Sequence, residues 1–363
     1  MLNILLTARS GSFDLTPLVS AAVWEGDYQR GARTLALTVA ATPYDSTLPV
    51  ADLSPGGAVQ LFEDGKLLFS GIIISRSRST GSNTITATCY DRGFYLLKNQ
   101  GIYQFKGETP EAIARRICGD FGITPGSLAP GGISIKRNFI GVTLYKIIMT
   151  AYTLAAQQNG KTYAIRFDGD AMDVVEVDVD NDTLLLEGGV NLQSASMSDS
   201  IDQTVTQVQI CDSDGNVQGT IKNDELIPLY GIIQQAIHQP DGEDSGAEAQ
   251  KVLDDNPLAQ TITVEALGSS LCRTNSTVAV REPYTGLYGL FWIQSDRHEW
   301  KGGQHYMKLS LSYKRLMDEQ EAGSLPRPSS TATSGTPAAD SGGTASFGTQ
   351  KYAVYIERVN MTR

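Results

Sequence analysis

The feature that most constrains the fold is a change of hydrophobic period within residues 84–123. Ile85, Ala87 and Cys89 alternate with threonines, which is the two-residue period of a half-buried β-strand. From residue 110 the spacing becomes helical, and the apolar stripe consists of Ile113, Ala114, Ile117, Cys118 and Phe121. Thr109 is the expected N-cap, and Gly122 is the expected stop. A strand that ends one domain and a capped helix that opens the next predict a domain junction.

Length and charge restrict the class of protein. A chain of 363 residues is too long for one ordinary core, so we expect several domains. It carries 29 Lys and Arg against 40 Asp and Glu, a net charge of -11. This balance offers no electrostatic attraction for phosphate backbones, so we expect no sequence-specific nucleic-acid binding. No apolar run has the length of a membrane span, and the N-terminus resembles a first strand, so we expect no membrane partner and no signal peptide.

The four cysteines indicate a reducing compartment. Cys89, Cys118, Cys211 and Cys272 are far apart and form no C-x-x-C pair. This spacing argues against a zinc ribbon or a disulfide framework. We interpret them as reduced packing residues of a protein made in the cytoplasm.

Residues 1–95 predict a first β-barrel domain. Short strands are expected over 1–9, 33–39, 58–62, 66–75 and 84–90. Hairpin turns are expected at 63–66 and 80–83, where glycine accepts the positive φ of a tight turn. The pattern is typical of a small antiparallel barrel or sandwich.

Residues 96–188 predict an α+β insertion domain. Helices are expected over 110–121 and 143–158, separated by a loop at 125–132. The second helix places apolar residues at helical spacing, namely Leu144, Ile147, Ile148, Ala151, Tyr152 and Ala155. Strands over 162–167 and 172–179 follow, with a turn at 168–170.

Residues 189–223 and 257–320 predict a second β-barrel domain. Its expected strands are 203–211, 216–221, 258–264, 277–280, 287–295 and 305–313. An acidic helical excursion is expected at 224–256, with Ala247, Ala249, Val252 and Leu253 facing inward. Segments 68–91 and 290–313 form a weak internal repeat of two alternating strands around a glycine-containing turn. The predicted fold is therefore mainly β, with two related β-barrels joined by a small α/β domain.

The C-terminal residues predict a tether and a docking element. Residues 321–350 are rich in Ser, Thr, Gly, Ala and Pro, which is typical of a flexible linker. Residues 351–363 contain an apolar alternation, and Tyr352, Val354 and Ile356 on one side of it are the candidate partner-docking residues. The alternative interpretation is an unstructured tail.

Two groups of residues resemble metal sites. Asp178, Asp180 and Asp182 have the spacing of a calcium loop, but Thr183 stands where that loop needs Gly, and Gly189 stands where it needs Glu. We interpret this segment as a solvated hairpin edge.

The second group comprises His298, His305 and Asp296, which share one face of a hairpin and could hold iron or zinc. A core stripe of Met307, Leu309 and Leu311 continues that face, so we expect packing beside Trp300 instead. We predict no metal and no cofactor.

The sequence contains no catalytic motif of the common hydrolases, nucleotide-binding proteins or zinc proteases, and His238 has no obvious partner. We therefore expect no enzymatic activity and no catalytic residue. The alternative is a cell-wall (peptidoglycan) hydrolase, because 40 acidic residues make chance carboxylate pairs inevitable.

Five segments carry a resemblance to a known family. They are YDRGFYLLKNQ (90–100), FKGETPEAIARRICGDFGI (105–123), TLYKIIMTAYTLAAQQNGKTYAIRFDGD (143–170), LIPLYGIIQQAI (226–237) and ITVEALGSSLCRTNSTVAVRE (262–282). Together they resemble the baseplate hub proteins of contractile phage tails and phage-tail-like bacteriocins, of the late-control D type, over residues 1–317. One departure is Asn275 in a turn where the family pattern suggests Gly, and Asn tolerates that conformation.

The resemblance implies a structural hub with two barrels like the tail-tube subunit in each chain. A homotrimer would form a pseudo-six-fold ring that joins the hexameric tail tube to the trimeric central spike. Implied partners are the tail tube protein, the central spike protein, baseplate wedge proteins and the tape-measure protein. The implied location is the tail baseplate of a virion or tailocin particle, after synthesis in the host bacterial cytoplasm.

Overall fold

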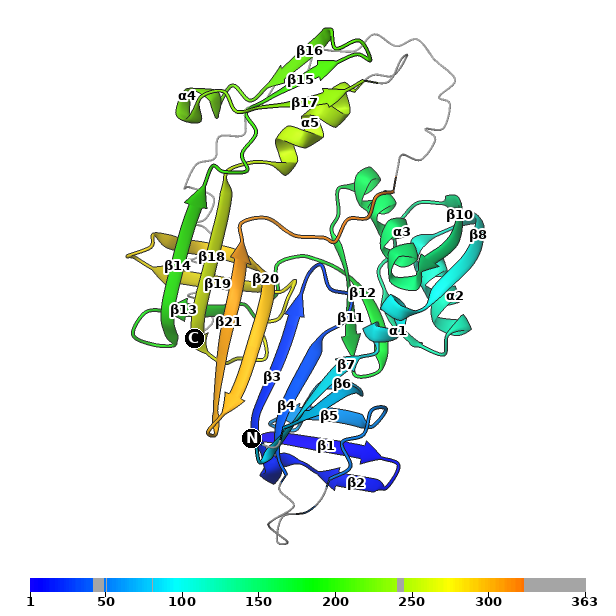
Figure 1. Ribbon diagram of the computed structural model, residues 1–363, viewed down its shortest axis with the longest axis vertical. Coiled ribbons are helices and arrows are strands. Elements are labelled where there is room, and N and C mark those ends of the chain that lie inside the picture. Colours follow the sequence, from blue (N-terminus) through cyan, green and yellow to red (C-terminus); the bar gives the residue numbers. More distant parts are fainter. Residues whose placement is uncertain (42–48, 50, 80, 240–244, 323–363) are drawn as a thin grey trace. The chain divides into compact units, whose positions relative to one another are not determined.

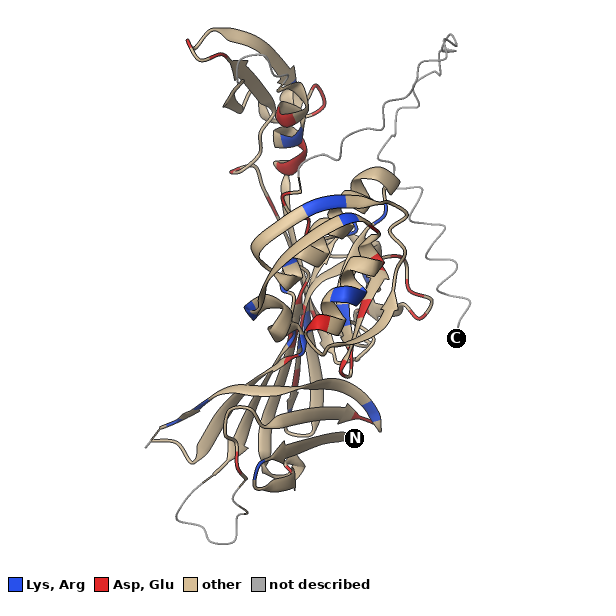
Figure 2. Ribbon diagram, turned by 90° about the vertical axis from the view of Figure 1, so that its right-hand side faces the viewer, with Lys and Arg blue, Asp and Glu red and all other residues tan. Residues whose placement is uncertain are grey.

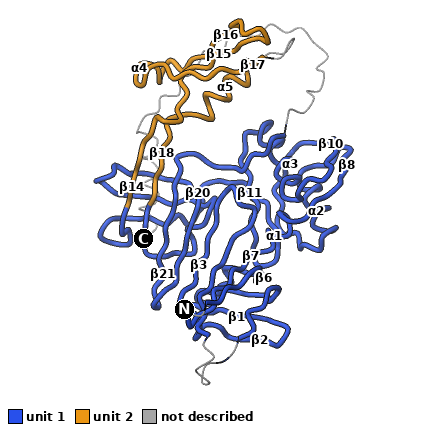
Figure 3. Tube along the Cα trace, viewed as in Figure 1, with its two compact units in different colours: residues 1–194, 264–363 blue, residues 195–263 orange. Residues whose placement is uncertain are grey.

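The computed structural model describes residues 1–41, 49, 51–79, 81–239 and 245–322. The chain divides into two compact units, one of Met1–Ser194 with Val264–Arg363 and one of Ala195–Thr263 (Figure 3). The expected linker at 321–350 extends beyond the described residues after position 322. The expected docking strand at 351–363, with Tyr352, Val354 and Ile356, lies wholly outside them.

The structure is mainly β, as predicted, and is organised around a 13-stranded sheet (Figure 1). Its first strands are β1 (Leu2–Ala8), β2 (Gly11–Asp14), β3 (Val19–Asp27), β4 (Thr34–Ala40), β5 (Ala58–Glu63), β6 (Lys66–Arg78) and β7 (Thr84–Asp91). Its later strands are β13 (Leu184–Glu187), β14 (Leu192–Ser200), β18 (Ala259–Leu267), β19 (Thr277–Glu282), β20 (Leu287–Lys301) and β21 (Gln304–Ser312). A 3-10 turn, η1 (Thr16–Leu18), precedes β3.

One strand order occurs twice in this sheet. The neighbours are β3-β4-β7-β6-β5 in one half and β14-β18-β21-β20-β19 in the other. Members of the two series also follow each other in the same order along the chain. The segments of the sequence repeat, 68–91 and 290–313, fall on the equivalent hairpins β6–β7 and β20–β21.

Strand β3 was not predicted. Its inward-facing positions include Ala22, Trp24 and Gly26, and the small Ala and Gly weaken the apolar alternation that identifies a strand. The strand is nevertheless central, because it pairs with β4 on one edge and with β20 on the other.

The predicted α+β part contains the helices α1 (Gly93–Lys98), α2 (Pro110–Asp120) and α3 (Leu144–Asn159). Strands β8 (Gln100–Glu108) and β10 (Ile135–Thr143) pair with each other, while β9 (Thr124–Leu128), β11 (Tyr163–Asp168) and β12 (Ala171–Glu176) form a second small sheet. Strand β9 lies partly within the segment expected to be a loop.

Both predicted helices form, and their apolar stripes build one core. All six predicted residues of α3 are buried, as are the four predicted residues that lie within α2. Phe121 was wrongly placed in the stripe, because it follows the last helical residue and is 38% exposed. Thr109 occupies the N-cap position of α2 without a side-chain capping bond, whereas Thr143 caps α3 by accepting from the Lys146 amide.

The unit of residues 195–263 has its own three-stranded sheet and its own core. It contains β15 (Gln207–Cys211), β16 (Val217–Lys222), α4 (Ile227–Tyr230), β17 (Gln234–His238) and α5 (Gly246–Asp255). The core comprises Val205, Val208, Ile210, Ala249 and Leu253. In Figure 2, α5 shows acidic residues near both of its ends.

Two expectations for this segment need correction. The hairpin over 203–221 pairs with β17 in this separate sheet, not with the strands of the second β domain. The excursion at 224–256 contains a strand besides its helices, because β17 joins β15 in parallel. Ala249 and Leu253 face the core as predicted, but Ala247 is exposed. Among the described helices, none is both long and apolar enough to cross a membrane.

Candidate functional site

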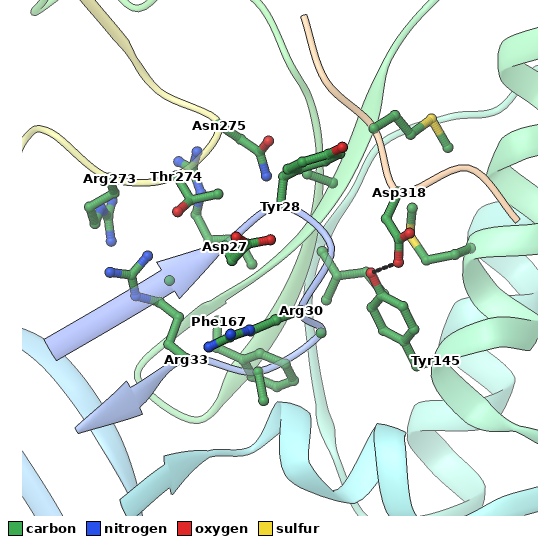
Figure 4. Close-up of a pocket in the computed structure, with 18 of the residues that line it drawn as sticks. Asp27, Tyr28, Arg30, Arg33, Tyr145, Phe167, Arg273, Thr274, Asn275 and Asp318 are labelled. Carbon is green, nitrogen blue, oxygen red and sulfur yellow. Dashed lines mark hydrogen bonds between the residues drawn. The ribbon is translucent and has the colours of Figure 1, made fainter. Parts of the chain in front are cut away.

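A pocket lies where the turn after β3 meets β11 and the loop before β19 (Figure 4). Its described lining includes Asp27, Arg33, Tyr145, Arg166, Arg273 and Asp318. The cavity has a volume of ≈ 40 Å³, which admits water or a small ion, whereas sites for organic ligands usually measure roughly 300–1,000 Å³.

Arg33 lines one side of this pocket and forms a buried ion pair with Asp296 behind it. The Arg33 guanidinium donates twice to the Asp296 carboxylate, with Nη1 2.9 Å from Oδ1. The Thr274 amide and hydroxyl each donate to the same Oδ1 at 2.6 Å. Burial opposes ionisation of Asp296, but Arg33 and Thr274 hold the pKa of this carboxyl below its ordinary value.

The sequence permits this pair because residue 26 is glycine. A Cβ atom at Gly26 would lie 2.2 Å from Arg33 Nη1. The guanidinium stacks on the indole of Trp24, with Cζ 4.0 Å from the ring centroid. The Arg33 side chain is therefore held between Trp24 on β3 and Asp296 on β20, which is 263 positions away in the sequence.

Two further arginines face the pocket without a carboxylate in ion-pair contact among the described residues. Burial lowers the pKa of Arg166, and burial together with repulsion from Arg166 and Arg33 lowers the pKa of Arg273 to about 10. The buried Arg273 Nε has no hydrogen-bond partner among the described residues. These cations favour ionisation of Asp296 at the centre of the group.

The opposite wall contains a carboxylic acid with a perturbed pKa. Tyr145 Oη donates to Asp318 Oδ2 at 2.8 Å, and this bond is drawn in Figure 4. Burial raises the pKa of Asp318 despite that bond, and Asp27 adds to the rise. A general acid needs such a shift. However, no Ser, Cys or His lies among the described lining residues, and the cavity is too small for a sugar ring.

The predicted histidine pair packs in the core beside the ion pair of Arg33 and Asp296. His298 Nδ1 lies 3.0 Å from His305 Nε2, and His298 Nε2 lies 2.9 Å from the Cys272 carbonyl. His305 stacks on Trp300, with ring centroids 4.2 Å apart. Asp296 is near, 3.4 Å from His298 Nε2, but it is engaged by Arg33. Within the described residues, no group of three or more His, Cys, Asp or Glu could hold a metal ion.

The three aspartates of the calcium-like segment do not converge. The Asp180 carboxylate accepts from the Thr277 amide at 2.8 Å, and Asp178 pairs with Arg315 at 3.0 Å. Asp182 is exposed. The segment therefore attaches to β19 through Asp180 and presents its remaining charges to solvent.

His298, His305 and Asp296 lie close together, as the sequence predicted, but their partners were not predicted. Glu63 Oε1 accepts from Trp300 Nε1 and lies 2.9 Å from His305 Nδ1. No local spacing could link Glu63 or Arg33 to residues more than two hundred positions away. The remaining histidine, His238, is exposed on β17.

Known proteins share both the sequence pattern and the fold. The model of the YqbQ-like family matches residues 22–312. The protein XkdQ of the phage-like element PBSX from Bacillus subtilis (strain 168) is 28% identical over 306 residues, covering 81% of this chain and 92% of that protein.

Solved structures extend the similarity of fold. The 43 kDa tail protein of prophage MuSo2 from Shewanella oneidensis has a TM-score of 0.64 at 15% identity, covering 85% of this chain and 98% of that one. The tail protein of Neisseria meningitidis MC58 has a TM-score of 0.58 at 15% identity, covering 85% and 96%. The chain thus has the fold of these tail proteins, and it belongs to the YqbQ-like family.

Proposed function

We propose that this protein is the structural hub of a contractile tail baseplate, in which three copies form a pseudo-six-fold ring. The observation that carries the proposal is the strand order that occurs twice in one sheet and in the same order along the chain. We interpret it as two related β domains in each chain. Three copies then present six such domains to a six-fold tube, while remaining three-fold for a spike.

The comparisons support the setting of this proposal. A relative comes from a phage-like element, and two proteins of the same fold are tail proteins. The proposed partners are the tail tube, central spike, baseplate wedge and tape-measure proteins, in a virion or tailocin particle. The net charge of -11 fits a ring whose channel must pass nucleic acid or a protein without retaining it.

The alternative of a peptidoglycan hydrolase rests on Asp318, whose raised pKa suits a general acid. The described pocket favours the structural role, because its cavity of ≈ 40 Å³ has no room for a saccharide and Asp318 is held by Tyr145. Incubation of the purified full chain with peptidoglycan should release no soluble fragments. Release that disappears in Asp318→Asn would instead support the hydrolase.

The copy number in the assembled particle tests the hub directly. We expect three copies per tail, by quantitative mass spectrometry against the tube protein and by cryo-electron microscopy of the particle. Six copies or one copy per tail would contradict the proposal.

A further inference from the structure

The sheet contains one junction between its two halves, and β20 forms it. Strand β20 pairs with β19 along Leu287–Trp292 in its first part and with β3 along residues 295–301 in its second part. Because β21 pairs with residues 292–301 on the other side, β19 and β3 share one edge of β20. A register shift between Ile293 and Ser295 separates the two parts.

Strand β6 repeats this arrangement but lacks the second partner. It pairs with β5 along residues 66–72 and with β7 along residues 71–78, and a register shift lies between Ile73 and Ser75. Ser75, Arg76, Ser77 and Arg78 are all exposed. Among the residues that the structure describes, no strand pairs with the edge of 75–78 that faces away from β7. This edge corresponds to the place where β20 receives β3.

Strand β14 is the counterpart of β3 and is also open. Each begins one of the two matching strand series, but β3 has two neighbours, whereas β14 ends the described path of the sheet with β18 as its neighbour. Within the described residues, each chain therefore contains one complete junction and two separate halves of the same kind of junction. A strand edge with unpaired backbone N–H and C=O groups is a ready template for pairing with another chain.

We propose that β14 of one copy pairs in antiparallel with residues 75–78 of β6 in the next copy, which closes the ring head to tail. The inference rests on the trimeric hub proposed above and specifies its contact. A head-to-tail contact uses two different surfaces on each copy and generates a ring when the rotation closes.

The buried faces of the two series fix the expected register. The buried residues of β4 and β7 are Leu35, Leu37, Val39, Ile85, Ala87 and Cys89. Taken in the same order, their counterparts on β18 and β21 are Ile262, Val264, Ala266, Met307, Leu309 and Leu311. This alignment matches Thr38 on β4 with Glu265 on β18. Ala21 is the partner of Thr38 on β4. Ser194 lies beside Glu265 on β18, because its hydroxyl donates to that carboxylate at 3.2 Å. We therefore match Ala21 with Ser194.

Carrying the β3·β20 pairing across gives definite partners. Asp27 pairs with Ser295 and Gly26 pairs with Asp296 inside the chain. On β14, Asp27 then corresponds to Ser200 and Gly26 to Asp199. On β6, the residues after the register shift correspond in turn, Ser295 to Ser75 and Asp296 to Arg76. The expected contact therefore places Ser200 opposite Ser75, and Asp199 opposite Arg76. The junction within the chain carries the cross-strand ion pair of Arg297 with Glu25. The proposed contact also places an acid, Asp199, opposite a base, Arg76, one position away from the counterparts of Arg297 and Glu25, and such a pair stabilises a cross-strand contact.

Disulfide trapping tests both the contact and its register. Ser75→Cys with Ser200→Cys, in a Cys211→Ser background, should give disulfide-linked trimers on oxidation in cells that produce the whole tail. The pair Ser77→Cys with Ser198→Cys has the same register and should also link. Opposed Cα atoms in a sheet lie about 4.5–5.5 Å apart, within reach of a disulfide. Each single cysteine variant, and Ser75→Cys with Ser196→Cys, are the controls that should stay unlinked.

The outcomes separate this inference from the hub itself. Three copies per tail without a link at either matched pair would overturn the strand pairing and leave the hub intact. Links only at the mismatched pair would overturn the register. Tails without three copies would overturn both proposals. In addition, Arg76→Glu should reduce linking at 75 and 200 several-fold, and Arg76→Glu with Asp199→Arg should restore it.

Discussion

His298 Nδ1 lies 3.0 Å from His305 Nε2, and this contact determines where the protons of the buried pair reside. The Cys272 carbonyl accepts only, so His298 Nε2 carries a proton, and burial, which disfavours a second proton on the ring, leaves Nδ1 as an acceptor. His305 Nε2 therefore donates to His298. One further proton lies between His305 Nδ1 and the Glu63 carboxylate, 2.9 Å apart. Burial of the ring, and not the hydrogen bonds by themselves, therefore keeps His298 neutral.

Acid should destabilise the protein through this neutral histidine. Burial lowers the pKa of His298 from 6.5 to about 4, with Asp296 opposing the shift and Arg33 and His305 adding to it. Between these values the unfolded chain binds a proton that the folded chain does not, so stability falls as the pH falls from 6.5 to 4. The shift corresponds to on the order of 3 kcal/mol. Urea unfolding of the wild type and of His298→Gln at pH 7 and pH 4.5 should show a smaller loss in the variant.

Replacing the packed histidines should cost stability without loss of any metal. We expect about 1–3 kcal/mol for His305→Ala, because Trp300 loses its stacked ring and Glu63 loses a partner. His238→Ala is the matched control and should stay within about 0.5 kcal/mol, because His238 is exposed. Metal analysis of the wild type should find neither zinc nor iron. Stoichiometric metal that disappears in His305→Ala would refute this assignment.

The local patterns of the sequence were sufficient for most elements. The helical stripe of Ile113 and Ile117, and the alternation of Ile85 and Cys89, each describe a face that packs against a neighbour, so periodicity identifies them. Strand β3 was missed because Ala22 and Gly26 provide little apolar signal around Trp24. The sequence therefore predicts elements with strong apolar patterns better than elements built from small residues.

Long-range partners could not be predicted in the same way. Arg33 and Asp296 meet because β3 and β20 pair, and that pairing follows from the whole sheet and not from any local spacing. The parallel pairing of β17 with β15 was likewise invisible, because β17 contains mostly exposed polar residues. Charged and polar contacts of the pocket therefore required the structure.

The threonines at the N-cap positions of α2 and α3 should differ in their contribution to stability. Thr143→Ala should cost about 1 kcal/mol, because the Thr143 hydroxyl accepts from the Lys146 amide at 3.3 Å. Thr109→Ala is the control and should cost less, because Thr109 has no such bond at α2. Thermal unfolding monitored by circular dichroism compares the two variants. Equal losses would show that capping does not distinguish them.

Removing the carboxylate of Asp296 should be the most damaging single change at the junction. Asp296→Asn leaves the Arg33 guanidinium, 17% exposed, without its anion beside the cations Arg166 and Arg273. We expect a loss of about 3–5 kcal/mol, which is typical when one partner of a buried pair is removed. Glu25→Gln is the matched control on the neighbouring strand. In the ion pair that it removes, the Glu25 side chain is 33% exposed and the Arg297 side chain is 47% exposed. We therefore expect a loss of less than about 1 kcal/mol.

The paired variant Asp296→Asn with Arg33→Met separates the ion pair from simple packing. In the native chain, Arg33 Cζ lies 4.0 Å from the ring centroid of Trp24. Met is apolar and long enough to cover the same ring. If the loss in Asp296→Asn arises from an unpaired buried cation, the double variant should recover about half of it or more in urea unfolding. A double variant less stable than Asp296→Asn alone would mean that the Arg33 side chain stabilises the junction mainly through contacts other than its charge.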